Sequence, residues 1–167
     1  MHPASAQVVK ITKPPGFGLT PAVLRHRIVD LRGDPSLPEF RRAVEFVKAT
    51  PVEYLERWSD ANAVFSDSVR LASVVAWKDG DVSFVITQPQ YHGQSASSWE
   101  IEWFFGESGW RSIRDPGGQH RIFFHDHFGV IAIDALPRNC YIHEGQLLPF
   151  DVILCRPTSE LDEYLRL

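Results

Sequence analysis

The pattern of apolar and polar positions predicts one well-defined amphipathic helix in the first half of the chain. Its apolar positions recur at the three- and four-residue spacing of a single helix face; they are Tyr54, Leu55, Trp58, Ala61 and Phe65. Thr50 precedes Pro51, a residue that suits the first helical position, and Glu53 lies three residues after the threonine. This spacing is typical of a capping box. We therefore predict a helix over residues 51–65.

Short apolar runs bounded by turn-forming residues predict that most other elements are strands. The predicted strands span residues 7–12, 69–77, 82–88, 119–124, 129–133, 140–143 and 148–154. Residues 78–81 and Gly145 supply turns between neighbouring strands. The segment 20–37 is mixed and turn-rich, with a turn expected at 33–35. The segment 38–49 fits either a short helix or a strand.

A second amphipathic helix is predicted over residues 98–108, after a serine-rich cap and before Gly109. Trp99 and Trp103 lie four positions apart, so they share one face of this helix. We expect both indole rings to pack in the core. If they were exposed instead, they would indicate a contact with a protein partner.

Composition favours one folded α+β domain with an antiparallel sheet and a few packed helices. The chain has 167 residues, of which 44% are hydrophobic and 12% aromatic, enough for a core that needs neither disulfide nor metal. A net charge of -4 argues against a broad nucleic-acid interface, which needs a basic surface.

The sequence also favours a cytoplasmic protein without a membrane partner. No apolar run approaches the roughly 20 residues of a membrane span, and the N-terminus lacks the pattern of a secretory signal. Cys140 and Cys155 form no recognisable framework, and we expect reduced thiols.

The chemistry-bearing residues lie in the last third of the chain. The apolar run 131–133 ends at Asp134, Asn139 follows five residues later, and Asp151 comes after a further apolar stretch. A carboxylate and an amide oxygen suit a hard cation such as Mg²⁺, and a second carboxylate can accept a proton from an attacking hydroxyl. Alternatively, Asp134 and Asn139 only shape a turn, a position that both residue types favour.

This arrangement resembles the catalytic loop and metal-binding strand of the protein-kinase-like superfamily, which includes the aminoglycoside phosphotransferases. The group it resembles most is the polyvalent protein kinase group of phage and mobile-element proteins. The resemblance implies ATP and Mg²⁺ as cofactors and an unidentified phosphoacceptor. It also implies that Asp134 is the catalytic base and that Asn139 and Asp151 are metal ligands.

The predicted first strand carries Lys10 between apolar residues, like the kinase strand whose lysine binds the nucleotide phosphates. The resemblance implies a partner glutamate on the following helix, for which Glu53 and Glu56 are both candidates. It also implies that residues 87–90, with Gln88, form the linker whose backbone meets the adenine. Alternatively, Lys10 only protects an edge strand from aggregation.

The resemblance covers residues 1–167 as a single kinase-like domain, but it is reduced at both ends. The residues before Lys10 are too few for a glycine-rich loop, and those after Asp151 are too few for most of the helical lobe. Asp134 also lacks a preceding His-Arg pair. A non-catalytic, pseudokinase-type binding or regulatory module is therefore the alternative function.

Two further kinds of site are weaker. His125 and His127 would share one face of a strand, and either Asp126 or His143 could complete a metal site. The same histidine segment is also typical of a polar turn. A nucleophilic Cys140 has no evident base, and no Gly-x-Ser-x-Gly motif is present.

Overall fold

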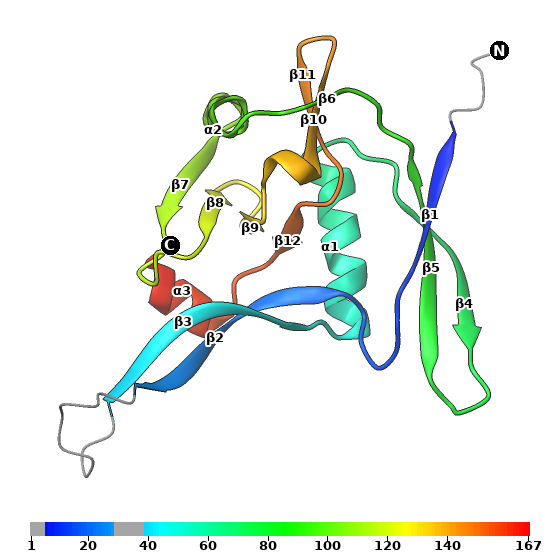
Figure 1. The fold of residues 1–167 in the computed structure, drawn as a ribbon, viewed down its shortest axis with the longest axis horizontal. Coiled ribbons are helices and arrows are strands. Elements are labelled where there is room, and N and C mark those ends of the chain that lie inside the picture. The colour runs from blue at the N-terminus through cyan, green and yellow to red at the C-terminus, as the bar shows by residue number, and fades with distance from the viewer. Residues whose placement is uncertain (1–5, 29–38) are drawn as a thin grey trace.

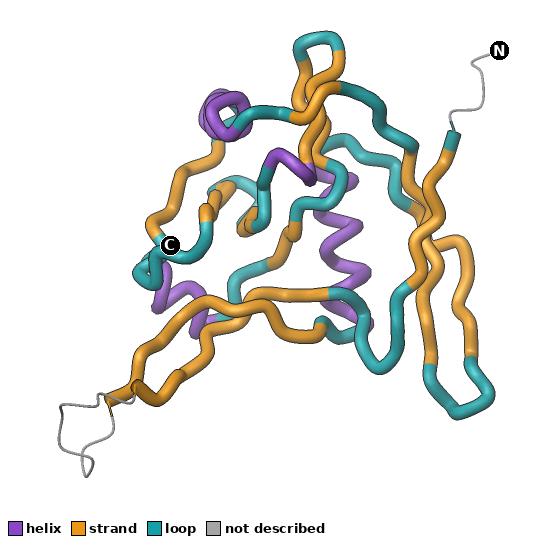
Figure 2. Tube along the Cα trace, viewed as in Figure 1, coloured by secondary structure: helices purple, strands orange, loops and turns teal. Residues whose placement is uncertain are grey.

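The computed structural model describes residues 6–28 and 39–167. Within these ranges the chain has three α-helices and twelve strands, and every strand pairing is antiparallel. Figures 1 and 2 show the predominance of strand over helix. The predicted α+β class is confirmed.

The strands form four small sheets. The first has the order β1 (Gln7–Ile11), β5 (Val82–Pro89) and β4 (Arg70–Ala76). The second is the long hairpin of β2 (Leu19–Ile28) and β3 (Glu39–Lys48). The third has the order β12 (Ile153–Cys155), β9 (Val130–Ile133), β8 (Arg121–His125) and β7 (Trp110–Arg114). The fourth has the order β11 (Gln146–Pro149), β10 (Cys140–His143) and β6 (Gln94–Ser95).

The helices begin where their caps predict. α1 (Pro51–Val64) starts with a complete capping box, in which Glu53 N donates to Thr50 Oγ1 and Thr50 N donates to the Glu53 carboxylate. α2 (Ser98–Glu107) has a second capping box at its start, and α3 (Ser159–Leu165) is capped by Thr158. Two of these helices were predicted from the sequence, and both are confirmed to within a residue or two.

The prediction for the region before α1 was partly wrong. Residues 19–28 form one ten-residue strand, so the prediction of a turn-rich segment is wrong there; the turn expected at 33–35 lies outside the described residues. The ambiguous segment 38–49 is the strand β3. Each strand of this hairpin is extended because of its partner, with Leu19 opposite Lys48 and Arg25 opposite Arg42. Charged and apolar residues do not alternate regularly along the two strands of the hairpin, so the sequence pattern does not reveal this pairing.

Two details of the second half of the chain also differ from expectation. β7 and β6 were not predicted, and the strand expected over 148–154 is two strands, β11 and β12. The break between them contains Phe150 and Asp151. Because β11 pairs with β10 and β12 pairs with β9, the chain changes sheets at this break. Asp151 therefore lies at a junction.

The main core forms where α1, α2 and the four-stranded sheet meet. Phe105 of α2 is fully buried, and its ring stacks on Phe123 of β8 with the ring centroids 4.3 Å apart. Trp58 and Trp110 are buried, but Trp99 and Trp103 are 69% and 55% exposed. The prediction that both belong to the core is wrong, because Ile101 and Phe105 form the inward face of α2.

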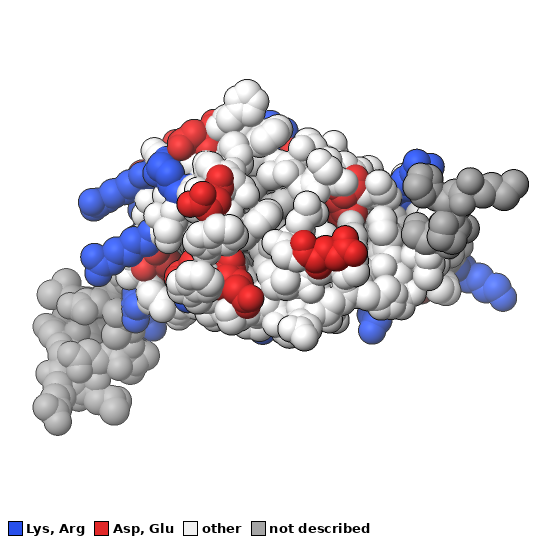
Figure 3. Space-filling model, turned by 90° about the horizontal axis from the view of Figure 1, so that it is seen from above, with Lys and Arg blue, Asp and Glu red and all other residues white. Residues whose placement is uncertain are grey.

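The surface carries charges of both signs. On the face in Figure 3, basic side chains lie mostly toward the periphery and acidic ones are scattered between large uncharged areas. In the ranges 6–28 and 39–167, no helix combines the length and the apolar character that a membrane span requires.

The packing of α2 predicts a contrast between two aromatic residues of the same helix. Phe105→Ala removes a fully buried ring and should lower the free energy of unfolding by about 3–5 kcal/mol. Trp103→Ala removes an exposed ring and should change it by no more than about 0.5 kcal/mol. Chemical denaturation followed by circular dichroism measures both, and equal losses in the two variants would contradict this packing.

Candidate functional site

Asp151 is the residue on which distant elements of the fold converge. Its Oδ1 atom accepts from Lys10 Nζ of β1 at 3.3 Å and from Arg57 Nη2 of α1 at 3.1 Å. Lys10 Nζ also contacts the carbonyl oxygen of Phe150 at 3.3 Å, and Arg57 Nη2 donates to the Asp151 carbonyl oxygen at 3.1 Å. One carboxylate therefore joins the first sheet, the first helix and the junction between β11 and β12.

Arg57 is a buried cation that the sequence analysis missed. Its side chain is only 9% exposed, and the guanidinium lies 4.7 Å from the centroid of the Trp58 ring. Burial lowers the pKa of Arg57 below its ordinary value, whereas the nearby carboxylates, Asp151 foremost and then Asp134, oppose that shift. Lys10 lies over the same Trp58 ring at 5.0 Å. Two cations thus share one aromatic surface and one carboxylate.

The sequence did contain a signal for Arg57. Residues 54, 57, 58 and 61 have the i, i+3, i+4, i+7 spacing of a single helix face, and all four are buried. An arginine within an otherwise apolar helix face needs a buried partner. Its partner, Asp151, lies 94 residues away in the sequence, so only the fold identifies it.

The loop between β9 and β10 brings Asp134 and Asn139 together as predicted. Asn139 Nδ2 donates to the Asp134 carbonyl oxygen at 2.7 Å and to Asp134 Oδ2 at 2.9 Å, and Arg138 Nη2 donates to Asp134 Oδ1 at 2.6 Å. Asp134 adopts a left-handed backbone conformation with φ 62°, which these bonds help to hold. The pair therefore shapes the turn, whatever further chemistry it performs.

The backbone links this loop to the Asp151 junction. Phe150 N donates to the Asn139 carbonyl oxygen at 3.0 Å, and Cys140 of β10 pairs with Pro149 of β11. Asp151 is therefore a neighbour of the loop along the chain and across the hairpin. Its carboxylate, however, bonds with Lys10 and Arg57 rather than with Asp134 or Asn139.

Gln88 has a structural role in the same region. Its side chain is buried, and Nε2 donates to Asp67 Oδ2 and to the Phe150 carbonyl oxygen, both at 3.0 Å. The backbone of residues 87–89 pairs with β1, where Gln88 lies opposite Val8. The predicted linker is therefore occupied by sheet pairing over most of its length, and Gln88 instead supports the backbone beside Asp151.

Neither candidate glutamate is brought to Lys10. The Glu53 carboxylate bonds with Thr50 in the capping box, and both Glu53 and Glu56 line a small pocket beside Arg156. The prediction that one of them pairs with Lys10 does not match these contacts. The cap explains this for Glu53, whose carboxylate is held by Thr50 at the start of α1, whereas Glu56 is exposed on the helix surface.

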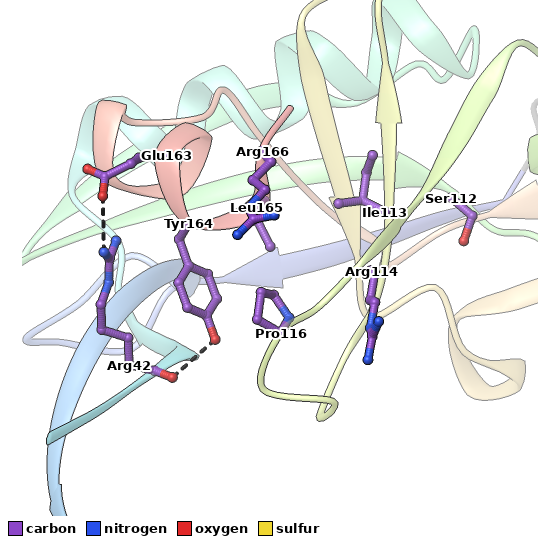
Figure 4. Close-up of a pocket in the computed structure, with 9 residues that line it drawn as sticks. All are labelled: Arg42, Ser112, Ile113, Arg114, Pro116, Glu163, Tyr164, Leu165 and Arg166. Carbon is purple, nitrogen blue, oxygen red and sulfur yellow. Dashed lines mark hydrogen bonds and ion pairs between the residues drawn. The ribbon is translucent and has the colours of Figure 1, made fainter. Parts of the chain in front are cut away.

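A pocket of about 430 Å³ opens beside Lys10 and Arg57. Its walls come from β1, the following loop, the end of the β2–β3 hairpin and α1. The residues that line it are Lys10, Ile11, Thr12, Lys13, Gly16, Gly18, Leu19, Lys48, Tyr54, Arg57, Trp58 and Asp151. A larger pocket, of about 780 Å³, lies between β3, β7 and α3 (Figure 4). Of the predicted site residues, only Lys10 and Asp151 line the smaller pocket and none lines the larger one, so the smaller pocket is the candidate site.

The weaker alternatives find no support in the described part of the chain. No group of three histidine, cysteine or acidic side chains is placed to hold a metal there. The His125 ring instead packs edge-on against Trp110 and Phe128. Cys140 and Cys155 are free thiols, and burial raises the pKa of Cys140 to about 12, which makes a nucleophilic thiolate unfavourable at neutral pH.

Comparison with protein-family models, curated proteins and solved structures finds no match for this chain. The chemistry of the site must therefore be inferred from the side chains around Asp151 and the pocket beside them.

The burial of Arg57 predicts that Asp151 contributes to stability despite its own partial exposure. Asp151→Ala leaves a buried guanidinium without its carboxylate and should lower the free energy of unfolding by about 2 kcal/mol. A matched control is Asp126→Ala, which removes an exposed carboxylate from its pair with the exposed Arg111. Urea denaturation should show a lower midpoint for the first variant and an unchanged midpoint for the second. Equal midpoints for both variants would show that Arg57 does not depend on Asp151.

Proposed function

We propose that this chain is a kinase-like domain that binds a nucleoside triphosphate at the site of Lys10, Asp134, Asn139 and Asp151. The observation that carries the proposal is the contact of Lys10 with Asp151 at 3.3 Å, across 141 residues of sequence. In kinases a strand lysine and an aspartate after the catalytic loop act on the same phosphates. The resemblance requires these two residues to meet, and in this fold they do.

The residues present fit a magnesium–nucleotide complex in their donor chemistry. Asn139 Oδ1 and Asp151 Oδ2 have no hydrogen-bond donor among the residues described, and both are hard oxygen ligands. Mg²⁺, when bound, would neutralise charge on the phosphates. Lys10 would bind phosphate oxygens, and Asp134 would accept the proton of the acceptor hydroxyl. Each carboxylate oxygen of Asp134 accepts one side-chain hydrogen bond, from Arg138 or from Asn139, and has a second lone pair for that hydroxyl.

The second candidate function is a non-catalytic, pseudokinase-type binding or regulatory module. The contact of Arg57 with Asp151 favours it, because a guanidinium 3.1 Å from the carboxylate competes with any metal there. In this case no phosphoryl group would be transferred, whether or not a nucleotide binds. The exposed Trp99 and Trp103 also meet the condition under which the sequence predicts a protein partner.

We assign the domain to the polyvalent protein kinase group of phage and mobile elements, on the resemblance of residues 131–151. The first function requires a nucleotide and a phosphoacceptor, and the second requires neither. We place the domain in the cytoplasm, where ATP is abundant, and the free thiols of Cys140 and Cys155 suit a reducing compartment.

The proposal predicts that ATP with Mg²⁺ stabilises the protein against heat. At 100 times its dissociation constant, a ligand of the folded state adds about 2.7 kcal/mol to the free energy of unfolding. Differential scanning fluorimetry should show a higher Tm, and Lys10→Met should reduce the increase because a phosphate contact is lost. Lys78→Met, in the exposed turn between β4 and β5, is the matched control and should respond like wild type.

A phosphoryl-transfer assay on the same protein decides between the two functions. Transfer of the γ-phosphoryl group to water, alcohols or added proteins, abolished in Asp134→Asn, would support the enzyme. A rise in Tm without any transfer would support the non-catalytic module. If millimolar ATP with Mg²⁺ leaves the Tm of the wild type unchanged, the chain does not bind nucleotide, the enzyme proposal fails and only the non-catalytic module remains.

A further inference from the structure

The pocket beside α1 has an unusual charge balance for a metal-dependent site. Four of its lining side chains are cationic, namely Lys10, Lys13, Lys48 and Arg57, and only Asp151 is anionic. Lys13 and Lys48 are exposed, and each is free to direct its ammonium group toward a ligand. The cations come from β1, the loop after it, β3 and α1, so the fold gathers them from separate parts of the chain.

Arg57 gives this pocket a buried charge with unused hydrogen-bonding capacity. The whole residue is 8% exposed, and its Nε–H is buried without an acceptor among the described residues. Its Nη2 atom shares the single carboxylate of Asp151 with Lys10. One negative charge therefore faces two positive charges at this point, so the local net charge is positive. A guanidinium is also the side chain best suited to bind phosphate oxygens in a bidentate manner.

The loop between β1 and β2 leaves room for a ligand. Gly16 and Gly18 both line the pocket, and they present backbone where other residues would present side chains. Gly18 has φ +78°, a conformation that glycine adopts without strain. A Cβ atom on Gly16 would lie 3.2 Å from the side chain of Lys48, so a larger residue would displace one of the cations.

We propose that this pocket binds an oligophosphate chain without a divalent cation, with Arg57 and Lys10 supplying the positive charge that Mg²⁺ supplies in kinases. The inference rests on the phosphate site proposed above and differs from it in one respect: protein cations, and not Mg²⁺, neutralise the phosphates. A divalent cation at Asp151 would face both Arg57 and Lys10, and like charges oppose that arrangement. The ligand is either a free polyphosphate or the triphosphate of a nucleotide, and these two sources share the chemistry that the pocket recognises.

Isothermal titration calorimetry with sodium tripolyphosphate tests this in buffer that contains EDTA. We expect saturable binding of one tripolyphosphate per chain, not strengthened when Mg²⁺ replaces EDTA. Lys13→Ala and Lys48→Ala remove exposed cations of the pocket without disturbing the core, and together they should weaken binding by about tenfold or more. Lys78→Ala removes an exposed lysine outside the pocket and should bind like wild type.

Arg57→Met provides the sharper test, since it removes the buried charge but retains an unbranched apolar side chain. We expect tripolyphosphate binding in EDTA to fall below detection, while circular dichroism confirms that the variant is folded. If that variant does not fold, the pair Lys13→Ala and Lys48→Ala still decides whether the pocket is the site. A parallel titration with ATP distinguishes the two ligand sources, because a nucleotide site should prefer ATP to tripolyphosphate.

The outcomes separate this inference from the proposed function. Binding of ATP only in the presence of Mg²⁺ would overturn the inference and leave the kinase-like site intact. Affinity for tripolyphosphate that the two lysine substitutions do not change would also overturn it. Absence of binding by tripolyphosphate and by ATP, with or without Mg²⁺, would overturn both.

Discussion

The carboxylate of Asp151 is the constraint that organises this fold around its pocket. It accepts bonds from a strand at one end of the chain and from the first helix, and it lies in the break between two sheets. The neighbouring Phe150 carbonyl accepts from Lys10 and from the buried amide of Gln88. β1, β5 and α1 thus meet at two consecutive residues, so the position of α1 and the shape of the pocket depend on the same contacts.

Local signals in the sequence were sufficient to predict an element wherever its conformation is set by residues that are close in the sequence. The capping box at Thr50 and Glu53 gives the start of α1, and the turn at Gly145 gives the hairpin of β10 and β11. They were insufficient for β2, whose extended form depends on pairing with β3. They also misassigned Trp99 and Trp103, because two aromatic residues on one helix face are equally compatible with core and surface.

The same distinction between local and long-range contacts decides which parts of the candidate site were predicted. Asp134 and Asn139 were predicted to lie together, and the six-residue loop between β9 and β10 does bring them into contact. The partner of Lys10 was not predicted, because the helix offers two glutamates near the expected position and the fold uses neither. The arginine at position 57 disrupts an otherwise apolar face, and that pattern was the available indication that this helix contributes a cation rather than an anion to the site.

Lys10 has an arginine beside it, where the resemblance implies a glutamate, and this difference changes what the site can bind. A lysine–glutamate pair is neutral and leaves a nearby aspartate free for a metal, whereas Lys10 and Arg57 together exceed the charge of Asp151. An anion can relieve this excess, while a cation would increase it. The turn of Asp134 and Asn139 is stable in either case, because its hydrogen bonds are internal to the loop. In the proposed function, the distinction between a catalytic and a non-catalytic domain therefore depends less on the presence of the two aspartates than on whether Asp151 binds a metal or stays paired with Arg57 and Lys10 in the phosphate complex.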